Sequence, residues 1–199
     1  KGYGLTDTDR KKSINSKTNF RLASVSKQFT AMCILLLEKD QKLSLDDPIS
    51  KFFPELPVEL SRKILLRHLI THTSGILDYE EIMDNSSSKQ LLDIDVLNIL
   101  KTQHKTYFNP GTEFRYSNSA YALLALIVER VSGQSFPEFM KERVFKPLKM
   151  KNSLVYESEV QIPNRSMGFA RDKDKQLYAN DQSSTSAIKG DGGVYCSLN

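Results

Sequence analysis

The sequence predicts an α/β fold of the α+β type, in which an antiparallel sheet is flanked by helices and interrupted by a mostly helical insertion. Three observations lead to this prediction. Residues 1–40 contain short strand-like segments followed by one apolar helix, helical periodicity dominates residues 41–160, and residues 161–199 turn polar and strand-like. Strands on both sides of a helical block indicate a chain that returns to one sheet. A cleft between the sheet and the helices is the expected site.

The N-terminal part is expected to form a hairpin that leads into a buried helix. The segments "KGYGLTD" and "TNFRLAS" have strand character, and a polar turn over residues 7–17 joins them. Residues 28–39 then form a helix that is apolar on nearly every side. Such a helix is typical of a protein core.

The middle of the chain is expected to be loop over 41–60 and helix from 61 to a stop at Gly75. Ser87 and Gln90 have the spacing of a capping box ahead of the next helix. A second buried helix is predicted over 117–133 and ends at Gly133, after which Ser135 and Glu138 cap a third. The segments "SMGFARD" and "KQLYAND" predict a second hairpin.

Composition and charge indicate a soluble globular protein without a nucleic-acid partner. Of the 199 residues, 39% are hydrophobic and 26% are charged, with a net charge of +4. The one dense basic cluster, Arg10 to Lys12 with Lys17 nearby, lacks interleaved aromatic residues and fits a solvated turn.

Neither a membrane span nor a cysteine-based site is expected. The longest apolar run, 31–37, is too short to cross a bilayer, so we expect no transmembrane segment, although a signal peptide could have been removed. Cys33 and Cys196 have neither disulfide-framework nor metal-ligand spacing. His68 and His72 lie one turn apart without a third ligand, so we interpret them as structural and expect no metal.

Ser24 and Lys27 are the first candidate reactive pair. A serine becomes nucleophilic next to a group that takes its proton, and a lysine one turn away can do so where burial favours the neutral amine. With 22 serines and 19 lysines, about two such pairs are expected by chance. Ser86/Lys89 and Ser186/Lys189 share the spacing, but only Ser24 lies between a strand and a buried helix. The alternative is that Ser24 is a helix cap and Lys27 extends to solvent.

Tyr116 and Asn118 form the second candidate pair. The Tyr-x-Asn spacing also occurs at Tyr107/Asn109 and Tyr178/Asn180. Only "FNPGTEFRYSN" puts the pair between a Pro-Gly turn and the start of a buried helix, where both side chains can face a cleft. Helix capping is the alternative role for Asn118.

Together these motifs resemble the serine beta-lactamase and penicillin-binding protein superfamily, in its class C beta-lactamase, DD-carboxypeptidase and esterase-like branch. The similarity runs through "GYGL", "FRLASVSKQFTA", "LSLDDPISKFFPELP", "LLRHLITHTSGILDY", "FNPGTEFRYSNSAYALLALIVERVSG" and "GDGGVYCS". It implies acyl transfer to Ser24, with Lys27 as the base, Tyr116 as a second proton-transfer group and Asn118 as a partner of Lys27 and of the substrate.

The resemblance implies a substrate that is a beta-lactam, a peptidoglycan stem peptide ending in D-Ala-D-Ala, or an ester. It implies a bacterial cell-envelope or secreted location, or a cytoplasmic one if the protein is esterase-like. Residues 1–199 are expected to form one incomplete catalytic domain. The family's third motif, Lys-Thr-Gly or His-x-Gly, is absent, so we expect a piece of a longer protein that is catalytically poor by itself.

Two other functions remain open. A Ser-His-Asp hydrolase could use His68, His72 or His104, but the chain has no G-x-S-x-G elbow. A non-catalytic relative of the same fold, acting as a beta-lactam sensor or a binding scaffold, is the stronger alternative. A sensor would keep its acyl group, whereas an enzyme would release it.

Overall fold

The structure is a computed structural model that describes residues 1–7, 12–84 and 89–199. Its helical elements are η1 (Ala23–Ser26), α1 (Lys27–Lys39), η2 (Ile49–Lys51), α2 (Val58–Ser61), α3 (Leu66–Ile70), α4 (Tyr79–Ile82), α5 (Asp93–Leu100), α6 (Asn118–Ser132), α7 (Phe136–Met140), the π-helical η3 (Lys141–Phe145) and α8 (Lys189–Gly192). Its strands are β1 (Phe20–Arg21), β2 (Leu154–Val155), β3 (Phe169–Arg171), β4 (Leu177–Ala179) and β5 (Val194–Cys196).

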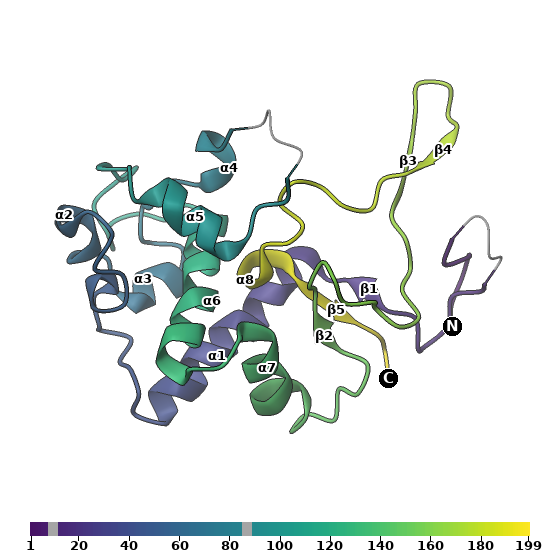
Figure 1. Ribbon diagram of the computed structural model, residues 1–199, viewed down its shortest axis with the longest axis horizontal. Helices are drawn as coiled ribbons and strands as arrows, with labels where there is room; N and C mark the ends of the chain where they lie inside the picture. The colour runs from purple at the N-terminus through teal and green to yellow at the C-terminus, as the bar shows by residue number, and fades with distance from the viewer. Residues whose placement is uncertain (8–11, 85–88) are drawn as a thin grey trace.

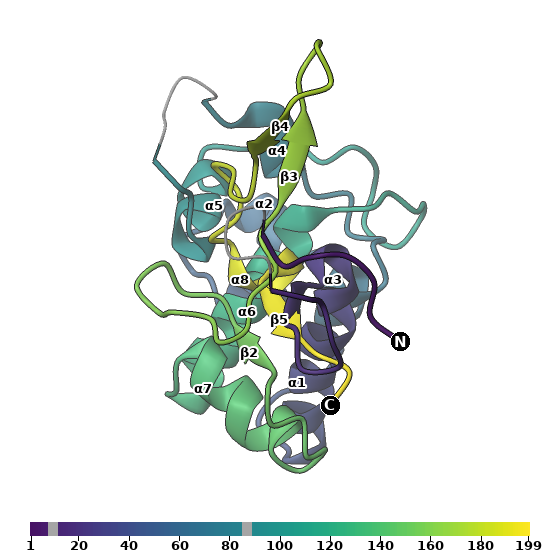
Figure 2. The ribbon, with the colours of Figure 1, turned by 90° about the vertical axis from the view of Figure 1, so that its right-hand side faces the viewer.

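The strands form two small antiparallel sheets beside the helices. One has the order β1-β5-β2, with Phe20 opposite Cys196 and Leu154 opposite Tyr195. The other is the β3-β4 hairpin, which extends away from the body of the molecule in both views (Figures 1 and 2). The α+β class with an antiparallel sheet and the second hairpin are therefore confirmed.

The predicted pairing of "KGYGLTD" with "TNFRLAS" is wrong, because each segment has a different partner. Leu5 pairs with Ser13, and the Thr6 amide donates to the Lys12 carbonyl at 2.8 Å. The "TNFRLAS" segment instead supplies β1, whose partner is β5 at the far end of the chain. Strand patterning identifies a strand but not its partner, which explains the error. Of the predicted basic cluster and capping box, Arg10, Lys11 and Ser87 lie outside the described residues.

Helix α6 is the centre of the core. Its residues from Ser119 to Val128 are all buried, and α1, α3, α5, α7 and α8 pack around it. Figure 1 shows it in the middle of the helical part, with the strands to one side. Gly133 ends the helix in the left-handed conformation at φ 73°, as the sequence predicts. The N-cap of α7 is also confirmed, because the Glu138 amide donates to Ser135 Oγ.

Two helix predictions need correction. Helix α1 spans nearly the predicted residues but is not buried all round, since Met32 and Leu35 are 45% and 41% exposed. An apolar sequence alone does not require every face to be covered. The helix predicted to stop at Gly75 is in fact α3, which ends at Ile70 because His72 adopts a positive φ of 57°.

The short helix α8 was not predicted, and it is held between α1, α5 and α6. A Cβ atom on Gly190 would lie 2.1 Å from the Tyr121 carbonyl oxygen of α6, so only glycine fits there. Thr30 of α1 donates to the Gly190 carbonyl at 2.7 Å. Asp93 of α5 accepts from the Lys189 and Gly190 amides at 3.0 and 3.1 Å.

Replacing Gly190 with alanine should reduce the free energy of unfolding by about 1–3 kcal/mol, because the added methyl group overlaps α6 backbone. Gly192→Ala is the matched control in the same helix, since its Cβ would meet Ala23 at an ordinary 3.6 Å. Urea unfolding of both variants checks this expectation. Equal stability of the two variants would contradict the close packing of α8 on α6.

Candidate active site

Ser24 lies in η1, the short turn between β1 and α1, and it is exposed to solvent. The preceding Ala23 has a φ of 47°, an unfavourable value for a non-glycine residue that is found mostly where the surrounding structure imposes it. Neither η1 nor α1 has a side-chain cap hydrogen bond. Ser24 is therefore not the helix cap that its position also allowed.

Lys27 lies in the first turn of α1 with its side chain turned inward, and the residue is only 6% exposed. Its Nζ donates to Asn118 Oδ1 and to the Asp191 carbonyl oxygen, each at 2.8 Å, and to Ser24 Oγ at 3.3 Å. The nitrogen also lies 4.8 Å from the centre of the Tyr116 ring. The alternative of a lysine extended into solvent is wrong here.

Tyr116 and Asn118 approach the same serine from the start of α6. The Tyr116 hydroxyl donates to Ser24 Oγ at 2.7 Å. Ser117, rather than Asn118, is the N-cap of α6, because Ser117 Oγ accepts from the Ala120 amide. The Asn118 side chain is thereby left to face Lys27, and the backbone N–H of Asn118 donates to Asp78 Oδ2 at 2.7 Å.

The other matches to the two spacings do not form comparable groups. Ser186 Oγ accepts from the Ser183 amide, while Lys189 pairs with Glu157 at 3.6 Å. Ser86 lies outside the described residues. Tyr107 donates to Glu81, and Tyr178 is exposed on β4. Only Ser24/Lys27 and Tyr116/Asn118 come together among the described residues.

A buried carboxylate behind Lys27 was missed by the sequence analysis. Tyr79, which is fully buried, donates its hydroxyl to Asp191 Oδ2 at 2.9 Å. Burial, opposed by the charge of Lys27, raises the pKa of Asp191 to about 7, and burial likewise raises that of Asp93 to about 6. Burial also raises the pKa of Tyr79, so this hydroxyl remains a donor.

The histidines do not form a metal site or a Ser-His-Asp arrangement. His68 Nδ1 accepts from the Leu65 amide, and His72 Nδ1 accepts from the Ser117 amide. No three His, Cys, Asp or Glu side chains gather as metal ligands within the described ranges. In those ranges, too, no helix is long and apolar enough to cross a membrane.

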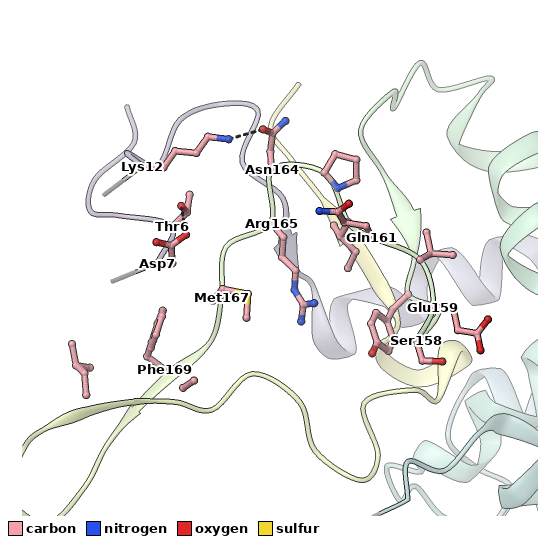
Figure 3. A pocket seen from close by; sticks show the side chains of 16 residues that line it. Thr6, Asp7, Lys12, Ser158, Glu159, Gln161, Asn164, Arg165, Met167 and Phe169 are labelled. Carbon is pink, nitrogen blue, oxygen red and sulfur yellow. Dashed lines mark hydrogen bonds between the residues drawn. The ribbon is translucent and has the colours of Figure 1, made fainter. Parts of the chain in front are cut away.

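One cavity of the described residues lies away from Ser24. It has a volume of about 830 Å³ and lies between the N-terminal segment, residues 156–165 and the β3-β4 hairpin (Figure 3). Polar side chains such as Lys12 and Asn164, joined at 2.8 Å, occupy its wall. Ser24 does not line this cavity and is open to solvent.

The comparison with protein families agrees with this geometry. The family model described as Beta-lactamase matches residues 1–199. The chain belongs to the beta-lactamase family. The resemblance seen in the sequence motifs is thus confirmed.

Relatives of this beta-lactamase-family chain include penicillin-binding protein 4* of Bacillus subtilis strain 168, which is 32% identical over 88% of this chain. A solved penicillin-binding protein from Bacillus halodurans superposes with a TM-score of 0.84 at 30% identity, over 98% of this chain. The D-amino acid amidase from Ochrobactrum anthropi SV3 gives 0.80 at 26% identity, also over 98%. The chain spans 40%, 60% and 56% of these three proteins.

The raised pKa of Asp191 predicts a pH-dependent stability. The folded state binds the Asp191 proton more tightly than the unfolded state does, so the contribution is full below about pH 4 and is lost as pH rises through about 7. Between pH 5 and 8, the free energy of unfolding should fall by roughly 2 kcal/mol more in the native protein than in Asp191→Asn.

Urea unfolding at both pH values measures this difference. Asp174→Asn, on an exposed turn, is the control and should follow the native curve. A curve for Asp191→Asn that parallels the native one would show that the Asp191 carboxyl does not have the assigned pKa.

Proposed function

We propose that the protein is a serine hydrolase that works by acyl transfer through an acyl-enzyme on Ser24. One observation carries the proposal: Ser24 Oγ is hydrogen-bonded by both the Tyr116 hydroxyl, at 2.7 Å, and Lys27 Nζ, at 3.3 Å. A nucleophile between two proton-transfer groups is the requirement for this chemistry. Membership of the beta-lactamase family supports it.

Lys27 is assigned the role of base. The Asn118 Oδ1 and Asp191 carbonyl oxygens can only accept hydrogen bonds, so they take two N–H groups of the lysine nitrogen. In the neutral amine, the third direction holds the lone pair and points to Ser24. The lone pair takes the serine proton while Oγ bonds to the substrate carbonyl carbon.

Tyr116 is assigned the second proton transfer. When the bond from the carbonyl carbon to the leaving nitrogen or oxygen breaks, the Tyr116 hydroxyl gives that atom a proton, and the Lys27 ammonium returns one to Tyr116. The Ser24 amide supplies one donor to the oxyanion. Water then releases the acyl group. In this proposal, residues 1–199 are one part of a single catalytic domain.

The substrate is proposed to contain a beta-lactam, a D-alanyl peptide or amide, or an ester group. The names of the relatives, penicillin-binding protein and D-amino acid amidase, support the first two groups. A beta-lactam sensor is the second candidate, favoured by the same Ser24 geometry, which serves acylation whether or not deacylation follows. No metal or cofactor takes part in the proposed steps.

Intact-mass spectrometry of the full-length protein tests the nucleophile. After incubation with benzylpenicillin or p-nitrophenyl acetate, native protein should gain one acyl group that peptide mapping assigns to Ser24, and Ser24→Ala should gain none. Loss of the adduct within minutes indicates a hydrolase, and an adduct that lasts for hours indicates a sensor. An adduct of equal yield in Ser24→Ala would refute the proposal.

Replacing Lys27 and replacing Tyr116 should slow acylation to different extents. Lys27→Met should abolish detectable acylation because it removes the base, and Tyr116→Phe should slow it by roughly 10²–10⁴-fold with little change in substrate affinity. Stopped-flow acylation with the ester measures both. Tyr178→Phe, on exposed β4, is the matched control. Native rates in Tyr116→Phe would remove Tyr116 from proton transfer.

A further inference from the structure

His72 contacts three consecutive residues at the entrance of α6. Its carbonyl oxygen accepts from the Arg115 amide at 2.9 Å, and its Nδ1 accepts from the Ser117 amide at 3.1 Å. Between these two bonds, its ring stacks on the Tyr116 ring, with centroids 4.6 Å apart and planes at 28°. His72 therefore restrains the Tyr116 ring by stacking, and it restrains the backbone on both sides of Tyr116 by its two hydrogen bonds.

We propose that His72 is a positioning residue that holds the Tyr116 hydroxyl on Ser24 only while its imidazole is neutral, so that acid releases Tyr116. The inference rests on the proposed proton-transfer role of Tyr116. His72 does not touch Ser24 in any recorded contact, so it acts through Tyr116. The sequence predicts a structural role for His72, and stacking on Tyr116 gives that role a consequence for catalysis.

The hydrogen bond to Ser117 determines the protonation state that His72 must have. Because Nδ1 accepts, the neutral ring carries its proton on Nε2. Protonation would add a hydrogen to Nδ1, which would then face the Ser117 N–H instead of accepting from it. The link to the N-cap of α6 would be lost, and with it one of the restraints on Tyr116.

The surroundings of His72 oppose its protonation. Burial, and then the positive charge of Lys27 on α1, lower the pKa of His72, while Asp78 at the start of α4 acts in the opposite direction. Two further titratable groups face the ring: Tyr116, which stacks on it, and Tyr121 of α6, whose ring centroid lies 5.0 Å away. The imidazole is thus neutral at pH 7. His72 becomes protonated, and Tyr116 is released, only at a pH below the usual pKa of histidine.

Two substitutions of His72 separate the effect of its stacked ring from the effect of its hydrogen-bond acceptor. His72 has a φ of 57°, a conformation that asparagine tolerates well. His72→Asn keeps an acceptor two bonds from Cβ and cannot titrate, but it loses the stacked ring. His72→Phe keeps a ring and loses the acceptor. Each variant therefore removes a different part of the proposed device.

The first test is non-additivity of acylation rates, measured on the full-length protein with p-nitrophenyl acetate at pH 7.5. His72→Phe should slow acylation roughly 10–100-fold in the native background, as expected when a reacting group is displaced. In the Tyr116→Phe background the same change should have less than a twofold effect. Equal effects in both backgrounds would overturn the proposal, and a Tyr116→Phe variant with native rates would instead refute the proposed function.

The second test is the pH profile of acylation between pH 4.5 and 8. The acid fall in rate should follow the His72 pKa measured by NMR of its ring proton, and it should move or disappear in His72→Asn. His68→Asn is the matched control, because His68 Nδ1 also accepts a backbone amide but from Leu65. An acid limb that is identical in His72→Asn and native protein would overturn the proposal even if His72→Phe fails to fold.

Discussion

The arrangement depends on the hydrogen bonds of one buried lysine nitrogen. Lys27 is 6% exposed, and a lysine in that position is costly unless its donors are satisfied. Three segments far apart in the sequence supply the oxygens: Ser24 beside α1, Asn118 at the start of α6 and the carbonyl of Asp191 in α8. The three segments must therefore be positioned so that each oxygen lies within hydrogen-bond distance of Lys27 Nζ.

Contacts elsewhere in the core hold α8 and the start of α6 in these positions. The absence of a side chain at Gly190 lets α8 reach α6, Asp93 satisfies the first amides of α8, and Tyr79 holds the Asp191 carboxyl. On the opposite side, Asp78 accepts from the Asn118 amide. Apart from the Tyr79–Asp191 hydrogen bond, which joins two side chains, these contacts involve a backbone atom on one side, so they fix the positions of the segments.

Sequence reasoning identified the four central side chains because context separated them from chance matches. The first pair, Ser24 and Lys27, lies where a strand leads into an apolar helix. The second pair, Tyr116 and Asn118, lies where a turn leads into a second apolar helix. The Asp191 carbonyl could not be found in this way, since a backbone acceptor has no residue signature. His72 was found but its contacts were not, because stacking on Tyr116 and bonds to Arg115 and Ser117 depend on how distant segments dock. The partner of β1 was likewise beyond local patterning, because Cys196 lies 176 positions after Phe20 in the sequence.

Chemical rescue tests the central role of Lys27 most directly. In the full-length Lys27→Ala variant, small alkylamines can enter the space that the side chain leaves beside Asn118 Oδ1 and the Asp191 carbonyl. If Lys27 takes the serine proton, acylation should be restored in proportion to the concentration of unprotonated amine, and it should rise with pH as that fraction rises. Rescue that follows the ammonium form instead, or native acylation in Lys27→Ala without added amine, would contradict the account.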